Sequence, residues 1–223
     1  MLHADMSAQA KRLPSAVVFD FDGTIADTFN DAVKLYNRLA PVYGYKPVKP
    51  EDLPSARNLT MKQFIREYDI PRMKIPSMVR EGRRIFGKRI GEIQPIVGMP
   101  ELLRELRPHV ETLGILTSNA KANVKAFLQK EDLAFFDFIS TTSKLSGKAK
   151  NLRAILKTFT LEPDELIYIG DECRDLKAAG KAEVRSVGVT WGFNLRKVLE
   201  KQKPDQVVDQ PLELLAWLRD EKA

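Results

Sequence analysis

A short apolar run that ends in two aspartates constrains this chain more than any other feature. Residues 16–19 read AVVF, and Asp20 and Asp22 follow, with Gly23 and Thr24 behind them. Two β-branched residues in a short apolar run favour a strand that is buried on both faces. Side chains two residues apart in an extended segment point to the same side, so both carboxylates would face one spot past the strand end.

Two carboxylates this close raise each other's pKa, which favours a bound cation or a shared proton. Gly23 permits a tight turn, and Thr24 has a side chain that can cap the following segment. A loop that merely caps the next helix would explain one of the aspartates but not both. The stretch therefore predicts a functional site at the end of a buried strand.

Length and composition restrict the class of protein. The 223 residues suit one larger domain, or a core with an insert, and no apolar run approaches the ~20 residues that span a bilayer. Residues 1–14 are expected to be a flexible N-terminal tail, since they lack the apolar core of a secretory signal. The single cysteine, Cys173, excludes an intrachain disulfide, and two histidines leave no zinc cluster. We expect a cytoplasmic protein without a membrane segment.

Strands and helices are expected to alternate through residues 15–26 and 96–223. The strands are predicted at residues 16–19, 112–116, 136–140, 165–169, 184–189 and 206–208. The helices are predicted at residues 100–107, 121–130, 148–159, 175–182 and 212–218. This alternation predicts a Rossmann-like three-layer α/β core, in which a parallel sheet is covered on both faces. Ligands of such sheets bind beyond the carboxyl ends of the strands.

Residues 27–95 are expected to form an inserted helical cap domain without strands. Helices are predicted from about residue 29 to 40, at 60–68 and at 77–90, and prolines break the chain between them. This segment holds 14 Lys and Arg against 8 Asp and Glu, so it carries the whole formal net charge of +6. Such an excess suggests attraction of an anionic ligand, although a solvated helical surface accounts for most of the charges individually. Nucleic acid is not an expected partner, because acids and prolines interrupt the basic residues and no recognition motif occurs.

Acidic residues at the predicted strand ends suggest a metal site. Asp20, Asp22 and Asp171 could surround a hard cation such as Mg²⁺, which prefers oxygen ligands. Asp175 lies four residues after Asp171, where it could ligate the ion or brace the site.

Other polar residues at the same edge suit a phosphate group. Thr117 and Ser118, followed by Asn119, offer hydroxyl and backbone N–H groups near a helix N-terminus. Lys148 follows a glycine at the start of another helix and would supply a positive charge. Lys144 and Lys150 compete with it for that role.

These residues also carry a resemblance to a known family. Four parts of the chain resemble the four motifs of the haloacid dehalogenase superfamily. They are the run from Phe19 to Thr24, the strand that ends at Thr117, Lys148, and the run from Gly170 to Asp175. The motifs occur in the family's order and cover the chain from about residue 16 to its end. The helical insert resembles the small α-helical cap of the phosphoglycolate phosphatase-like branch.

The resemblance implies a role for each motif residue. Asp20 would be the nucleophile that forms an aspartyl-phosphate, and Asp22 would be the general acid and then the base for water. Asp20, the backbone carbonyl of Asp22, and Asp171 would hold Mg²⁺, while Thr117 and Lys148 would hold the phosphoryl oxygens. Relatives often have Thr-Asn where this chain has Thr-Ser-Asn, so Ser118 is an alternative to Thr117. Dehalogenating members lack an aspartate at the position of Asp22, which argues against carbon–halogen hydrolysis here.

Three functions remain open at this point. The first is a Mg²⁺-dependent phosphatase of a small phosphomonoester, either phosphoglycolate-like or a sugar phosphate, whose partner is a small phosphorylated metabolite. The second is a phosphomutase of the same fold, and the third is a non-catalytic binding module. Substrate specificity would come from the cap, although each candidate is more often a surface residue, and Arg83 and Arg84 are expected to be exposed. The candidates are Arg57, Asn58, Lys62, Arg66, Arg83 and Arg84.

Overall fold

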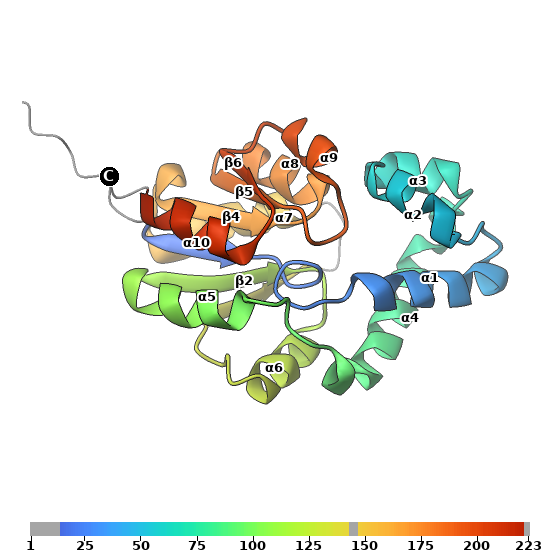
Figure 1. Cartoon of the computed structure of the whole chain (residues 1–223), viewed down its shortest axis with the longest axis horizontal. Helices are drawn as coiled ribbons and strands as arrows, with labels where there is room; N and C mark the ends of the chain where they lie inside the picture. The colour runs from blue at the N-terminus through green and yellow to red at the C-terminus, as the bar shows by residue number, and fades with distance from the viewer. Residues whose placement is uncertain (1–13, 143–146, 221–223) are drawn as a thin grey trace, which may run out of the picture.

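The computed structural model describes residues 14–142 and 147–220 (Figure 1). The expected tail, apart from Pro14, and the competing Lys144 lie outside the described residues. Within them the chain forms a parallel sheet, helices on both of its faces, and a helical insertion after the first strand.

The described residues form one six-stranded sheet in which every pairing is parallel. Its spatial order is β3-β2-β1-β4-β5-β6, so the first strand lies in the centre. The register pairs Phe19 of β1 with Ile115 of β2 on one side and Ile169 of β4 on the other. The strands are β1 (Ala16–Phe19), β2 (Thr112–Thr117), β3 (Phe138–Thr141), β4 (Leu166–Gly170), β5 (Arg185–Val189) and β6 (Gln206–Val208).

Alternate residues of the central strand enter two different cores. Val17 and Phe19 pack with helices α5, α6 and α10, whereas Ala16 and Val18 pack with α7 and α8 on the opposite face. Full burial on both sides explains the continuous apolar run of β1. These helices are α5 (Met99–Leu106), α6 (Lys121–Lys130), α7 (Lys148–Phe159), α8 (Cys173–Ala182) and α10 (Pro211–Asp220). The three-layer α/β core that the sequence predicts is thereby confirmed.

The insertion is helical and has a small core of its own. Its helices are α1 (Phe29–Tyr43), α2 (Leu53–Arg57), α3 (Met61–Glu67) and α4 (Ile75–Lys88). Leu39, Tyr45, Tyr68 and Ile70 are buried among them. The two connections to the sheet run side by side, since the N–H of Asp27 donates to the carbonyl of Gln94 at 2.9 Å. The insertion lies near the end of the sheet where the strands finish (Figure 1), while the bounds 27–95 of a separate cap domain stay a prediction.

Prolines interrupt the insertion less than the sequence suggests. Helix α1 continues through Pro41 and ends at Tyr43, and the following Gly44 adopts a left-handed φ of 74°. Pro54 lies in the first turn of the unpredicted helix α2, and Pro76 lies in the first turn of α4. Proline is tolerated there because its missing N–H would have no helical partner. A second helix that the sequence did not reveal, α9 (Arg196–Glu200), follows β5.

Single-turn 3₁₀ segments connect several of these elements. They are Pro50–Asp52, Arg72–Lys74, Ile90–Glu92, Arg107–His109 and Pro163–Glu165. None of the helices within residues 14–142 and 147–220 is both long and apolar enough to span a membrane.

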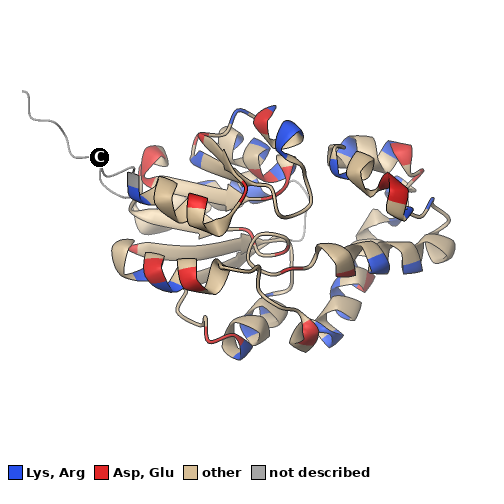
Figure 2. Cartoon of the chain, viewed as in Figure 1, with Lys and Arg blue, Asp and Glu red and all other residues tan. Residues whose placement is uncertain are grey.

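Charges of both signs are interspersed over the insertion (Figure 2). Several basic residues there have acidic neighbours, as in the pairs Lys46–Asp69 and Arg84–Glu81. Exposed pairs of this kind contribute little to stability. Part of the formal excess of basic residues is therefore offset by acidic neighbours on the same surface.

Candidate active site

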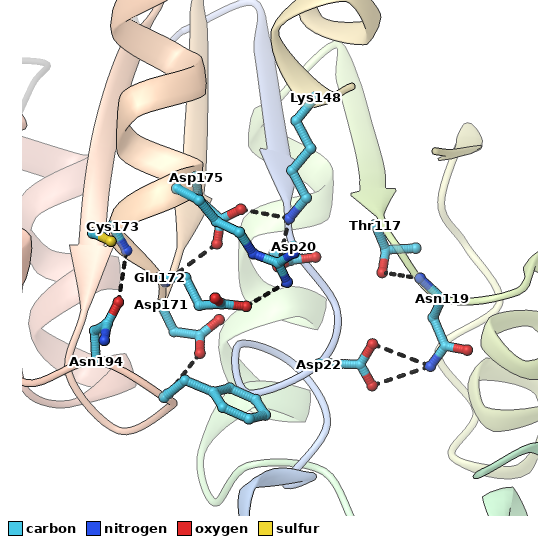
Figure 3. Close-up of polar contacts among 12 residues, drawn as sticks. Asp20, Asp22, Thr117, Asn119, Lys148, Asp171, Glu172, Cys173, Asp175 and Asn194 are labelled. Atoms are coloured by element: carbon cyan, nitrogen blue, oxygen red, sulfur yellow. Dashed lines mark hydrogen bonds and ion pairs between the residues drawn. The ribbon is translucent and has the colours of Figure 1, made fainter. Parts of the chain in front are cut away.

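Asp20 lies at the centre of the candidate site. Its N–H donates to the carbonyl of Ile169 at 2.8 Å, which holds the first residue after β1 against β4. Its side chain is 5% exposed, and its Oδ2 lies 2.6 Å from Nζ of Lys148 (Figure 3). The same Nζ donates to Oδ1 of Asp175 at 2.6 Å. Lys148, at the start of α7, thus bridges two buried carboxylates, whereas Lys150 is exposed.

Asp171 follows the neighbouring strand and is completely buried. Its Oδ1 accepts a hydrogen bond from the hydroxyl of Thr24 at 2.8 Å, and its Oδ2 accepts one from the N–H of Phe193 at 2.7 Å. Gly23 packs directly against this carboxylate with a φ of +76°, and a Cβ there would collide with Oδ2. The turn after β1 therefore requires glycine both for its backbone angle and for its close approach.

Asp20, Asp171 and Asp175 converge. Each offers a carboxylate oxygen, and these atoms all lie within 4.8 Å of one another. With Lys148 as the ammonium shared by two of them, these three carboxylates leave two negative charges uncompensated in a buried place. A divalent cation with a preference for oxygen ligands matches both the charge and the donor atoms.

The ionisation of these groups reflects this imbalance. Burial raises the pKa of Asp20 to about 7; the charge of Lys148 opposes that rise, and the charge of Asp175 adds to it. Burial, and then the charges of Glu172 and Asp20, raises the pKa of Asp171 well above its usual range. Burial alone would lower the pKa of Lys148, but Asp175 and Asp20 outweigh it, and that pKa is raised. The ammonium group of Lys148 therefore stays charged. Its single positive charge is shared between the two carboxylates that it contacts.

Asp22 lies apart from this cluster. Asn119 donates its Nδ2 to both carboxylate oxygens of Asp22 at 3.1 Å, and Figure 3 shows these two residues facing each other. Burial raises the pKa of Asp22 to about 6, with the Asn119 hydrogen bond opposing the shift. The chain turns directly after Asp20, as an isolated β-bridge between Asp22 and Ala26 shows. That both side chains face one spot stays a prediction, while the structure shows that Asn119 also lies against the Asp22 carboxylate.

The residues after β2 hold each other in place. Thr117 is fully buried, and its Oγ1 accepts a hydrogen bond from the N–H of Asn119 at 3.0 Å. Asn119 in turn accepts at its Oδ1 from Asn123 at 3.0 Å, so its side chain is fixed while it binds Asp22. Ser118 is partly exposed and lines a cavity together with Asp22. Asn119 thus holds the carboxylate of Asp22 in position, a role that the sequence did not indicate.

This cavity, of about 350 Å³, lies between the insertion and the ends of the strands. Core residues Asp22, Ser118 and Asn119 line it on one side, and α1, α3 and α4 supply mainly apolar side chains on the other. A small ligand that enters it would contact both parts of the molecule.

Glu172 and Arg174 also line the cavity, and sequence reasoning missed them. Nη2 of Arg174 lies 2.5 Å from Oε1 of Glu172. Burial would lower the pKa of Arg174, but Glu172, Asp175 and Asp20 outweigh it and raise that pKa further. The signal available in the sequence was an arginine between the two aspartates of a strand-end loop, which spacing alone does not mark as functional.

Arg57 is the candidate specificity residue that joins the insertion to the core. Its Nη2 donates to the carbonyls of Thr190 at 3.0 Å and Gly192 at 2.6 Å, and the guanidinium stacks 5.0 Å from the ring centre of Phe29. Its own carbonyl accepts from Nδ2 of Asn194 at 3.0 Å. The loop that holds Gly192 and Asn194 also contains Phe193, whose N–H donates a hydrogen bond to Asp171.

The other five candidates separate into two groups. Arg83 lines the cavity and donates from Nη2 to the carbonyl of Thr142 at 3.0 Å, so the expectation that it is exposed is wrong: the packing of α4 against the core half-buries it. Arg84 is exposed as expected and pairs with Glu81. The remaining three are exposed and absent from the cavity lining; they are Asn58, Lys62 and Arg66.

Comparison with known proteins agrees with this geometry. Residues 17–189 match a family model described as haloacid dehalogenase-like hydrolase. The chain is 32% identical over 201 residues to the phosphoglycolate phosphatase of Synechococcus elongatus, which covers 90% of this chain and 95% of that protein. It is 26% identical over 214 residues to the pyrophosphatase PpaX of a Bacillus cereus strain, covering 92% of this chain and 96% of the relative.

A solved structure with the same fold agrees with these relatives. A crystal structure described as a predicted phosphatase from Clostridium acetobutylicum superposes with a TM-score of 0.77 at 27% identity, over 93% of this chain and 99% of that one. The family match covers both connections of the insertion and the strands that carry Asp20 and Asp171. The chain therefore belongs to the haloacid dehalogenase-like hydrolase family, among its phosphoglycolate phosphatase-like members.

Proposed function

We propose that this enzyme is a Mg²⁺-dependent phosphatase of small phosphomonoesters that works through an aspartyl-phosphate on Asp20. The observation that carries the proposal is the contact of buried Asp20 with Lys148, beside the carboxylates of Asp171 and Asp175. A carboxylate nucleophile needs a cationic neighbour to approach an anionic phosphate, and it splits hydrolysis into two easier steps. The names of the relatives, phosphoglycolate phosphatase and pyrophosphatase, support phosphate chemistry.

The residues present fit a magnesium ion. Asp20 and Asp171 would hold it, with the backbone carbonyl of Asp22 as a further oxygen and Asp175 within reach to ligate or to brace Lys148. Bound Mg²⁺ would offset the repulsion between the phosphate and the nucleophile and would orient the transfer.

In the first step, a carboxylate oxygen of Asp20 attacks the phosphorus, and the bond from phosphorus to the leaving-group oxygen breaks. Asp22 gives its proton to that oxygen, which leaves as an alcohol. A pKa of about 6 suits this role, since an ordinary aspartate would rarely carry a proton near neutral pH. Lys148 stabilises the phosphoryl oxygens, together with the hydroxyl of Thr117 or of Ser118.

In the second step, water attacks the phosphorus of the aspartyl-phosphate. Asp22, now ionised, accepts a proton from that water, the bond between phosphorus and the Asp20 oxygen breaks, and inorganic phosphate is released. Asn119 keeps the Asp22 carboxylate in place for both transfers, because it binds both of its oxygens.

The substrate we propose is a small phosphorylated metabolite, either phosphoglycolate-like or a sugar phosphate. A cavity of about 350 Å³ next to Asp22 suits a leaving group of that size. The segment 27–95 would act as the cap that closes over the substrate. The single cysteine supports our placement of the enzyme in a reducing cytoplasm.

Phosphate release from p-nitrophenyl phosphate tests the proposal directly. We expect steady release that requires Mg²⁺ and is abolished by Asp20→Asn, which removes the attacking oxygen and a metal ligand. A folded enzyme that isomerises a hexose phosphate without net release of phosphate would instead be a phosphomutase. A folded protein that does neither with any phosphomonoester would be a binding module, and either result would overturn the proposal.

A further inference from the structure

Three residues that line the cavity beside Asp22 each have a buried polar atom without a hydrogen-bond partner. Among the described residues, three buried side-chain atoms have no hydrogen-bond partner: Thr28 Oγ1, Arg83 Nε and Arg174 Nε. All three residues line this one cavity. They come from three different parts of the chain: the start of α1, the middle of α4, and the first turn of α8. Buried polar groups are normally paired, so three unpaired ones around one space suggest a ligand that pairs with them.

The chemistry of these atoms indicates what that ligand is. Both nitrogens are guanidinium donors, and a hydroxyl can donate as well. Arg174 shares its charge with Glu172, whereas Arg83, within the described residues, donates to the carbonyl of Thr142 and pairs with no acid. A planar guanidinium with a free donor binds carboxylate and phosphate groups well. The matching ligand is an anionic group.

The position of Asp22 indicates which part of the substrate this is. In the function proposed above, Asp22 protonates the oxygen of the leaving group, and Asp22 lines the same cavity as Arg83 and Arg174. Whatever is attached to that oxygen must therefore extend into the cavity. We propose that Arg83, Arg174 and Thr28 form a leaving-group subsite that binds a second anionic group of the substrate, a carboxylate or a phosphate; this inference rests on the proposed phosphatase function.

The surroundings strengthen such a contact. Leu35, Phe64, Met78 and Phe86 from the insertion supply apolar surface around the same space. An apolar wall keeps water away, and charge pairs gain strength where water is excluded. A substrate without the second anion would leave the arginine donors unpaired, which is how a polar site rejects a close analogue.

The subsite also joins the two parts of the molecule. Arg83 belongs to the insertion, whereas Arg174 belongs to the first turn of α8 in the core, next to Asp175. A second anion would contact both arginines only while the insertion lies against the core. Specificity is then expressed in the closed arrangement, in which Asp22 meets the leaving oxygen.

Matched substrates separate this inference from the proposed function. We would measure kcat/KM with Mg²⁺ for 2-phosphoglycolate, for pyrophosphate, and for 2-hydroxyethyl phosphate, in which a neutral hydroxyl replaces the carboxylate. The wild-type enzyme should prefer at least one of the two anionic substrates over 2-hydroxyethyl phosphate by about 10- to 100-fold, the scale of one charged hydrogen-bonded contact. Which of the two is preferred distinguishes a carboxylate from a phosphate as the second anion.

Variants test the residues. Arg83→Gln should lower kcat/KM for the preferred anionic substrate about 10- to 100-fold, leave 2-hydroxyethyl phosphate within about 3-fold, and be partly rescued in Arg83→Lys. Arg84→Gln, the adjacent exposed arginine, is the control for loss of charge alone and should leave the preference intact. Thr28→Val, which removes only the hydroxyl, should reduce the preference by a smaller factor. Melting temperatures confirm that each variant is folded.

Three results would overturn the inference while leaving the phosphatase intact. These are equal rates on anionic and neutral substrates, equal losses on both in folded Arg83→Gln, or the same loss in Arg84→Gln. If Arg83→Gln does not fold, the substrate preference of the wild type and the effect of Thr28→Val decide instead. Failure to hydrolyse any phosphomonoester, p-nitrophenyl phosphate included, would contradict the proposed function itself.

Discussion

The ammonium nitrogen of Lys148 lies 2.6 Å from Oδ2 of Asp20, and both side chains are almost completely buried. It lies equally close to Asp175, so one cation holds two carboxylates at the ends of neighbouring elements. Removal of Lys148 would leave these carboxylates facing each other in a place with little water.

Lys148→Met should therefore reduce Mg²⁺-dependent phosphate release by at least about 100-fold, the scale of a lost electrostatic contact to a developing charge. The metal-free variant should also melt at a lower temperature than the metal-free wild type at pH 8. Lys150→Met, on the exposed face of the same helix, is the matched control and should behave like the wild type. Comparable activity in the two variants would show that Lys148 does not assist the reaction.

The stability of the metal-free protein should depend on pH in an unusual direction. Burial raises the pKa of Asp20 to about 7 and that of Asp22 to about 6, above the values of the unfolded chain. Between the unfolded and the folded pKa values, the folded state binds more protons, so stability falls as the pH rises through that window. The melting temperature in chelator should be higher at pH 5.5 than at pH 8 by roughly 5 °C or more.

Saturating Mg²⁺ should reduce this difference, because it binds only the folded, ionised cluster. Thermal unfolding at several pH values, with chelator and with Mg²⁺, measures both effects. A metal-free melting temperature that rises from pH 5.5 to pH 8 would contradict the inferred ionisation of the site.

Arg57 should control how firmly the insertion lies against the core. Its contacts with the carbonyls of Thr190 and Gly192 are the reason. Arg57→Ala should raise KM about 3- to 30-fold and lower kcat less, since lost closure weakens binding before it alters the chemistry. Lys62→Ala, an exposed change on the neighbouring helix, serves as the control. An unchanged KM in a folded Arg57→Ala variant would rule out this role.

Gly23 should be needed for the position of Asp171. Gly23→Ala would introduce a Cβ that collides with the Asp171 carboxylate, at a φ of +76° that side chains rarely adopt. We expect at least about 10-fold weaker Mg²⁺ binding and a similar loss of activity, because ligand positions tolerate little displacement. Gly91→Ala, where a Cβ would meet nothing within 4 Å, should be neutral. Isothermal titration with Mg²⁺ distinguishes the two variants, and equal affinities would refute the role of Gly23.

The sequence predicts those parts of the site that follow from strand ends. Asp20 and Asp171 are predicted because parallel strands place their carboxyl ends at one edge, and apolar runs locate those ends well. Lys148 lies at a helix start, where the sequence pattern also leaves Lys144 and Lys150 open. The chain turns after β1, so a period of two no longer applies there, and the contact between Asp22 and Asn119 could not be predicted from spacing. The spacing of residues within one segment does not predict a contact between residues as distant in the chain as Asp22 and Asn119.

Long-range packing accounts for the remaining differences. Arg83 and Arg174 are 91 positions apart in the chain and meet one cavity only because α4 packs against the core. The short helices α2 and α9 also depend on the contact between the insertion and the loop at residues 190–195, where the N–H of Leu195 donates to the carbonyl of Arg57. Neither helix is long enough to show a periodic apolar pattern.

The central claim is that Asp20 carries the phosphoryl group during turnover. Acid quench of the enzyme within milliseconds of mixing with Mg²⁺ and 2-phosphoglycolate or p-nitrophenyl phosphate, followed by peptide mass spectrometry, measures this directly. We predict a phosphorylated peptide in which the modification maps to Asp20, forms no more slowly than phosphate is released, and is absent from Asp20→Asn. Steady phosphate release without any phosphorylated Asp20, or with undiminished turnover in Asp20→Asn, would contradict the account.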